Sequence, residues 1–242
     1  MRAALNLIGW WGLTLGALLA PLTDASAEAR VAAARAIELE GKVLVITDAN
    51  AVRRLGVAQD VYPEETIVTL GRARVLLRFT DNSKYELGPA TRFRIDTYRY
   101  SRDPDSDFAA TRVLKGFFRF VSGEISRRRP HSTSIGVPVA TIGIRGTHVV
   151  GEVTETSARI GLLAPEDGDH PSAIEVSNPY GTVTINQPGL VTEIPDAKSP
   201  PSPPRPMDLH TMTRNLRAVQ TMRRAIAPRM PPPALIASAS PL

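Results

Sequence analysis

The side chains with the most obvious capacity for chemistry are four histidines: His131, His148, His170 and His210. No two of them have the H-x-x-x-H or H-E-x-x-H spacing that directs two imidazoles to one metal ion. His148 directly follows residues 145–147 and could act as a ligand or general base. A hydrogen-bonded histidine in the core or at its rim is the commoner case. The histidines therefore predict no metal site and no catalytic base.

Acidic residues gather in two short segments, 103–107 and 165–170, and the second contains Glu166, Asp167, Asp169 and His170 around Gly168. Hard cations favour loops of this texture, but the spacing of a calcium-binding loop is missing. We therefore interpret both segments as solvated loops. The sequence also has no cysteine, no G-x-S-x-G and no phosphate-binding glycine loop. We expect no enzyme activity, no metal and no cofactor.

The stretch of residues 138–153 combines strand-forming side chains with three glycines and Arg145. Strand interiors disfavour glycine, and arginine is rarely buried without a partner. Because side chains alternate along a strand, Arg145 is expected to share a face with Thr147 and Val149. We interpret Arg145 as a buried residue that closes the fold against backbone carbonyls or a carboxylate, with the candidate acids Asp81, Glu86 and Glu124. The alternative is an arginine that binds an anionic group of a ligand.

The elements expected to position these residues are short strands. Between residues 39 and 195, strand-forming runs are separated by turn residues. Residues 91–100 alternate apolar with charged side chains, as a half-buried strand does. A hairpin turn is predicted at Asp81, Asn82 and Ser83. With roughly ten to twelve such strands and no long helix, the pattern predicts an all-β roll or sandwich.

Composition and the N-terminus indicate one exported domain. A chain of 242 residues suits one domain with tails. The net charge of +5 is modest, and the basic residues form no dense stripe, so nucleic-acid binding is not expected. Residues 1–27 have a positive start, an apolar run and a small-x-small site, which predicts a cleaved signal peptide rather than an uncleaved anchor. We expect a soluble mature chain without a transmembrane segment, periplasmic or secreted, in which residues 28–39 form an N-terminal lead.

The C-terminal part of the chain has a different amino-acid composition. Residues 196–206 are rich in proline and are expected to form an extended linker. Residues 207–242 form a basic tail, in which Met212, Leu216, Val219, Met222 and Ile226 fall at roughly helical spacing. This tail is either disordered, a helix that docks on protein, or, least favoured, a helix that contacts anionic lipid.

Several of these elements together resemble the FecR domain family. The family's f-x-D-G-s turn corresponds to Phe79, Asp81, Asn82 and Ser83, and its G-x-R-G-T element to Gly143, Arg145, Gly146 and Thr147. Asn82 stands where the family usually has glycine, and asparagine also tolerates left-handed backbone angles. The resemblance covers about residues 40–195. It implies a single all-β FecR-type domain, built as a roll or sandwich, that senses, binds or assembles at the cell envelope.

The resemblance leaves three functions open. The family is named for a membrane-spanning regulator that relays a signal to a sigma factor, and the cytoplasmic and transmembrane parts of that regulator have no counterpart here. The leading interpretation is therefore a non-catalytic exported module that binds an envelope protein or polymer. The alternative is a soluble periplasmic sensor whose ligand alters a membrane signalling protein. An enzyme acting on cell-wall glycan is least favoured, because no pair of carboxylates stands out.

Overall fold

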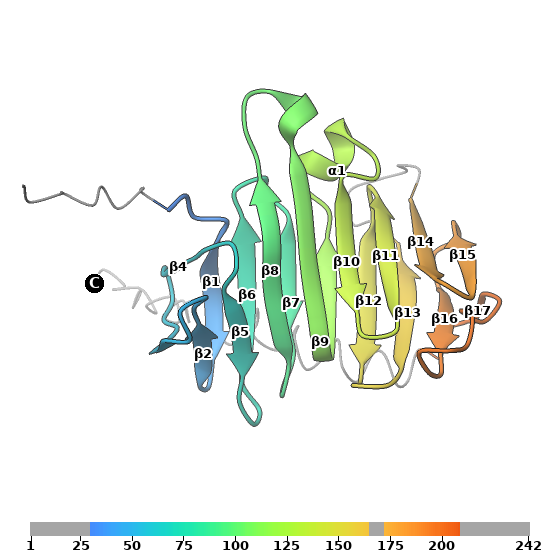
Figure 1. Ribbon diagram of the computed structural model, residues 1–242, viewed down its shortest axis with the longest axis horizontal. Helices are drawn as coiled ribbons and strands as arrows, with labels where there is room; N and C mark the ends of the chain where they lie inside the picture. The colour runs from blue at the N-terminus through green and yellow to red at the C-terminus, as the bar shows by residue number, and fades with distance from the viewer. Residues whose placement is uncertain (1–29, 165–171, 209–242) are drawn as a thin grey trace, which may run out of the picture. The chain divides into compact units, whose positions relative to one another are not determined.

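The computed structural model describes residues 30–164 and 172–208 (Figure 1). Within these ranges, the part from Val31 onward contains seventeen strands, one α-helix, α1 (Glu124–Arg128), and one 3-10 helix, η1 (Pro104–Ser106). The predicted all-β fold is confirmed. The strands outnumber the ten to twelve expected, partly because three of them are only two or three residues long.

The strands form two sheets, which we call sheet A and sheet B. Sheet A runs in the order β4 (Asp60–Val61), β1 (Ala34–Glu40), β6 (Arg74–Phe79), β7 (Lys84–Leu87), β9 (Phe108–Val121), β12 (His148–Val153), β13 (Ala158–Leu163), β16 (Leu190–Ile194) and β17 (Arg205–Pro206). Sheet B runs in the order β3 (Val52–Arg54), β2 (Val43–Ile46), β5 (Thr66–Thr69), β8 (Arg92–Arg99), β9, β10 (Thr133–Val137), β11 (Ala140–Arg145), β14 (Ala173–Asn178) and β15 (Gly181–Ile185). All neighbours are antiparallel except β9 and β10, which are parallel.

The long strand β9 belongs to both sheets. Its first half pairs with β8 and β10 in sheet B, and its second half pairs with β7 and β12 in sheet A. The change of sheet occurs at Gly116, where φ is +106°. A Cβ atom at this position would lie 2.4 Å from the Cα of Thr91, so only glycine fits the bend. Residues 108–121, whose glycine at position 116 could have divided them into two strands, therefore form one continuous, bent strand.

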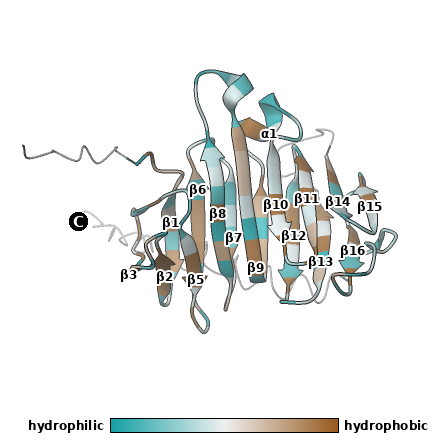
Figure 2. Ribbon diagram, viewed as in Figure 1, coloured by the Kyte–Doolittle hydropathy of each residue, from teal (hydrophilic) through white to brown (hydrophobic). Residues whose placement is uncertain are grey.

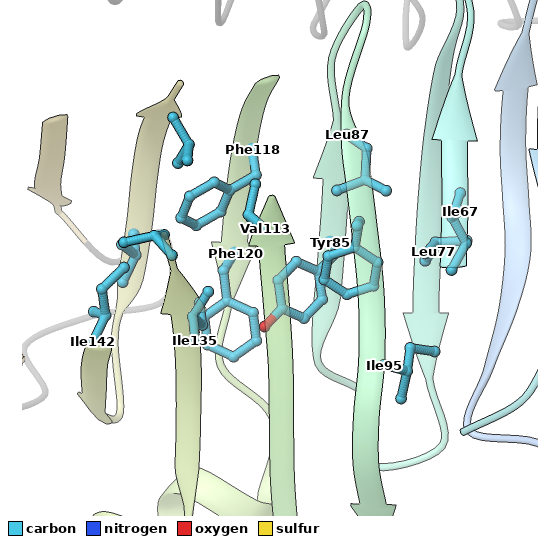
Figure 3. Close-up of a cluster of buried hydrophobic side chains, with 14 of the residues drawn as sticks. Ile67, Leu77, Tyr85, Leu87, Ile95, Val113, Phe118, Phe120, Ile135 and Ile142 are labelled. Atoms are coloured by element: carbon cyan, nitrogen blue, oxygen red, sulfur yellow. The ribbon is translucent and has the colours of Figure 1, made fainter. Parts of the chain in front are cut away.

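The core lies between the two sheets. Hydrophobic and hydrophilic positions alternate along the strands, as the sequence pattern predicts (Figure 2). The inward apolar side chains of both sheets form one buried cluster (Figure 3). The rings of Tyr85 on β7 and Phe93 on β8 lie 4.7 Å apart between centroids, so the aromatic contacts join sheet A to sheet B.

Most of the described part of residues 28–39, interpreted above as an N-terminal lead, belongs to the paired strand β1, which begins at Ala34. β1 lies between β4 and β6, and Ala34 and Ala36 are buried in the core. Alanine favours helix in isolation, and the alanine-rich sequence gives little sign of a strand. Here the small side chains fit a position in the sheet where packing overrides that preference.

The proline-rich residues 196–206 are also part of the folded unit rather than a free linker. β17 pairs with β16, and the backbone N–H of Ser202 donates to the carbonyl of Glu193 at 2.9 Å. Met207 is buried against sheet A. Proline lacks an N–H, but an edge strand tolerates it because one side of the strand needs no partner. The predicted signal peptide and residues 209–242 of the predicted basic tail lie outside the described residues.

Candidate functional site

The G-x-R-G-T element forms a turn that crosses from one sheet to the other. β11 belongs to sheet B and β12 to sheet A, and Gly146 adopts φ +55° between them. The turn is held on both sides: Ser122 N donates to Thr147 O at 3.1 Å, and Ser172 Oγ donates to Gly146 O at 3.3 Å. The predicted common face of Arg145, Thr147 and Val149 is therefore wrong, because alternation restarts after the turn.

Arg145 is exposed, so its interpretation as a buried residue that closes the fold is wrong. Ile142 and Ile144 occupy the inward positions of β11, which leaves Arg145 on the outward side. The three candidate acids have other partners. Glu86 pairs with Arg119, and Glu124 pairs with two arginines of its own helix.

Asp81, the third candidate acid, organises the predicted hairpin turn. Its Oδ1 accepts hydrogen bonds from the backbone N–H and hydroxyl of Ser83 at 3.1 and 2.6 Å, and its Oδ2 accepts one from Ile125 N at 3.3 Å. Tyr98 also donates to Oδ1 at 3.2 Å. Burial, aided by the Asp81 charge, raises the pKa of Tyr98 far above its ordinary value, so the phenol keeps its proton. Asn82 has φ +65°, which confirms the predicted turn.

A pocket of about 740 Å³ is bordered by α1 and by the end of β11. Figure 1 shows that these two elements lie at the same end of the strands. The described residues that line it come from the end of β9, from α1 and the loop after it, from the G-x-R-G-T turn, and from the ends of β14 and β15. Gly146 and Thr147 border it together with Arg145, so three residues of the motif meet at one cavity. This volume is in the range that binds small organic ligands.

The histidines divide between this pocket and the undescribed residues. His131, with φ +77°, and His148, on the outward side of β12, both line the pocket. Ile142 and Ile144 point into the core from β11, whereas His148 follows the turn and is not part of that core cluster. The acidic segment 165–170 with His170 lies outside the described residues, as does His210. Within residues 30–164 and 172–208, no three His, Cys, Asp or Glu side chains are grouped as metal ligands would be.

Some pocket residues give little signal in the sequence. Ser122 follows β9, Arg127 lies on α1, and Asn186 follows β15. Each comes from a different part of the chain, and only the crossing of strands between sheets brings them together. The cluster of basic residues at 127–129 is visible in the sequence, but nothing there connects it to Arg145.

The fold and this site define a two-layer all-β domain with a pocket at one end of its sheets. Residues 65–166 match the FecR protein family. This part of the chain is therefore a FecR domain, which confirms the family resemblance, and it includes both the turn at Asp81 and the G-x-R-G-T element. Neither helix in the described ranges has the length and hydrophobicity of a membrane span.

Two crystal structures of a candidate anti-sigma factor from Parabacteroides distasonis, at 2.50 and 1.65 Å resolution, are similar to this chain. They align with TM-scores of 0.45 and 0.46 at 12% and 11% sequence identity. The alignments cover 61% of this chain and 62% of each of those chains, so the chain spans less than two thirds of their length. No curated protein matches this sequence.

Proposed function

We propose that this chain is a non-catalytic, exported binding module with a regulatory role at the bacterial cell envelope. The FecR domain at residues 65–166 supports the regulatory class. The amino-terminal sequence supports export, since residues 1–27 have the pattern of a signal peptide. The observation that carries the binding role is the chemistry of the outward face of sheet B.

Two rows of side chains cross this outward face, and we call them the basic face. One row joins Arg54, Leu44, Val68, Arg92 and Lys115 in register from β3 to β9. The next row joins Val52, Ile46, Thr66, Arg94 and Arg112 in the same order of strands. Each row therefore ends in two cations that directly oppose one another on β8 and β9.

Cations that face each other across a strand pair destabilise a sheet. Acidic neighbours offset only part of this cost on the basic face. Asp96 lies 3.1 Å from both Arg94 and Arg112 (carboxylate oxygen to guanidinium nitrogen). Lys115 lies 3.5 Å from Glu155 (Nζ to Oε1), whereas no acidic side chain among the described residues pairs with Arg92. At the other end of the second row, on β3, Val52 is 61% exposed. A surface with several cations, of which Arg92 has no acidic partner among the described residues, and with an exposed aliphatic residue suits a protein partner with an acidic, partly apolar surface.

The test is capture of envelope proteins by the mature chain, residues 28–242, and by a variant with Arg92→Glu and Arg112→Glu. Arg72→Glu is the matched control, because Arg72 is an exposed arginine in the turn before β6. We expect one membrane-bound regulatory protein to be retained by the mature chain and the control and lost by the double variant. Equal retention by all three would contradict a partner on the basic face. A shortened chain for the same experiment should end at Asp208, because residues 199–207 are part of the fold.

Export is tested separately. The full chain, produced in a Gram-negative host with a C-terminal tag, should be found in the periplasmic fraction with Glu28 as its first residue. Retention in the cytoplasm with Met1 intact would refute export, whatever the capture experiment shows.

A second candidate function, a ligand sensor, is favoured by one observation: the pocket next to α1 is bordered by the motif that characterises the domain. In a sensor, a ligand in this pocket would change how the domain meets its partner. The two candidates differ in whether the purified domain binds a small molecule.

A further inference from the structure

We propose that the pocket next to α1 binds a small organic anion, and that Arg145 provides the principal charge that holds its phosphate or carboxylate group. This inference deepens the sensor function proposed above by naming the class of ligand. It can be tested on the purified chain without any partner, so its failure is distinguishable from failure of the regulatory role.

The first step in the argument is the charge of the pocket. Its described lining contains Arg127, Arg145, His131 and His148, and no aspartate or glutamate. Arg127 is partly neutralised by Glu124, whose Oε1 lies 3.3 Å from its Nη1. Arg145 has no ion pair with any residue that the structure describes. Among the described residues, no acid therefore compensates the Arg145 guanidinium, a group whose fork of donors matches phosphate and carboxylate.

The second step concerns Thr147, two residues further along the same turn. Its side chain is 1% exposed and lines the pocket, and its Oγ1 makes no hydrogen bond within the described part of the chain. A buried hydroxyl without a partner costs stability. Such a group is expected where a bound ligand completes the hydrogen bonding. Valine would fill the same volume without this cost, so packing alone does not account for a threonine at this position.

The third step is the size and polarity of the cavity. About 740 Å³ exceeds what a bare inorganic anion needs and suits an organic molecule. Besides the arginines, Ser122 and Asn186 line the cavity and can bond to hydroxyl groups. The combination fits a polar organic anion of the size of a sugar phosphate or a sugar acid.

The experiment measures binding to the mature chain by isothermal titration calorimetry at constant ionic strength. The probes are glucose 6-phosphate, glucuronate and uncharged glucose. We expect one of the two anions to bind and glucose to bind at least tenfold more weakly, and the comparison of the anions tells a phosphate ligand from a carboxylate. Equal binding of glucose and the anions, or no binding of either anion, would overturn the proposal.

Variants decide which residues are responsible. Arg145→Gln should weaken anion binding about tenfold or more, because it removes a charge-assisted pair, and its exposed position should leave folding intact. Arg72→Gln, another exposed arginine, is the control and should bind like the parent chain. Thr147→Val should keep or raise the melting temperature without ligand yet weaken binding. Unchanged affinity in Arg145→Gln would refute the assignment.

Discussion

The guanidinium of Arg119 lies 3.0 Å from the carboxylate of Glu86 (Nη1 to Oε1), and both side chains are only 8% exposed. The two residues are directly opposite on β9 and β7. They point away from the core, because Phe118 and Phe120 occupy the inward positions of β9. This pair is the buried arginine–carboxylate contact that the sequence suggested for Arg145, found instead in the middle of sheet A.

Replacing Glu86 with glutamine should therefore destabilise the protein strongly. It removes the acidic member of the buried Arg119–Glu86 pair, and breaking a buried pair in this way costs about 3–5 kcal/mol in comparable cases. Urea unfolding monitored by circular dichroism measures the loss. The double variant Glu86→Leu with Arg119→Met should recover much of the lost stability, since two apolar side chains need no ionic partner. A double variant no more stable than the single one would contradict this account.

The carboxylate of Asp81 should stabilise the hairpin turn through its hydrogen bonds. It accepts four hydrogen bonds, from Ser83 (two), Tyr98 and Ile125, and Asp81 is 2% exposed. Asp81→Ala removes the carboxylate oxygens and leaves buried donor groups without an acceptor. We therefore expect a loss of roughly 3 kcal/mol in the free energy of unfolding. Asp107→Ala is a useful comparison at another buried aspartate, whose carboxylate accepts hydrogen bonds from the backbone N–H and hydroxyl of Ser101 at 2.8 and 3.5 Å and lies only 3.8 Å from Arg128 Nη1. It should cost less than Asp81→Ala.

Replacement by alanine should lower the free energy of unfolding strongly at one glycine and change it little at another. At Gly116 the added Cβ would meet Thr91 at 2.3–2.7 Å in a backbone conformation that alanine rarely adopts, so we expect a loss of about 3 kcal/mol. At Gly143 the nearest atom to an added Cβ is 3.8 Å away, and Gly143→Ala should change the free energy of unfolding by less than about 1 kcal/mol. Thermal unfolding of both variants gives the comparison. Similar losses at the two positions would show that the bend in β9 is not the cause.

These glycines also show what the sequence could and could not predict. Alternation predicted the half-buried strand at residues 91–100, where Phe93 and Ile95 are buried, and turn residues predicted the turn at Asn82. Each of these features depends only on neighbours along the chain. Gly151 reads as an interruption of a strand, yet it leaves room for the ring of Phe118, since a Cβ there would lie 2.2 Å from that ring. That contact joins residues far apart in sequence and leaves no local signal.

Prediction of the candidate site was limited in the same way, because local patterns do not show long-range contacts. The motif at Gly143, Arg145, Gly146 and Thr147 was found from the sequence, but its environment was not. Whether Arg145 points inward depended on a turn that moves the chain from sheet B to sheet A, and a period-two pattern cannot show such a change. The contributions of Ser122 and Asn186 to the pocket depend on the long-range order of the strands.

The contact between β16 and the proline-rich segment should depend on pH through Glu193. Hydrogen bonds from Arg205, with a further contribution from Arg159, hold the pKa of Glu193 below its ordinary value. A carboxyl group whose pKa is lower in the folded chain stabilises that chain above the unfolded value, about 4.3. This contribution is lost as the pH falls through the folded value. The side chain is 28% exposed, so the contribution should not exceed about 1 kcal/mol.

The free energies of unfolding of the parent chain and Glu193→Gln should therefore differ at pH 6 and converge near pH 3. Urea unfolding of both proteins at the two pH values gives this difference directly, because the other carboxyl groups titrate in both. Arg205→Gln should reduce the same difference, since it removes the main cause of the lowered pKa. A gap between parent and Glu193→Gln that is constant from pH 6 to pH 3 would mean that the ionised carboxylate does not hold the proline-rich segment against sheet A.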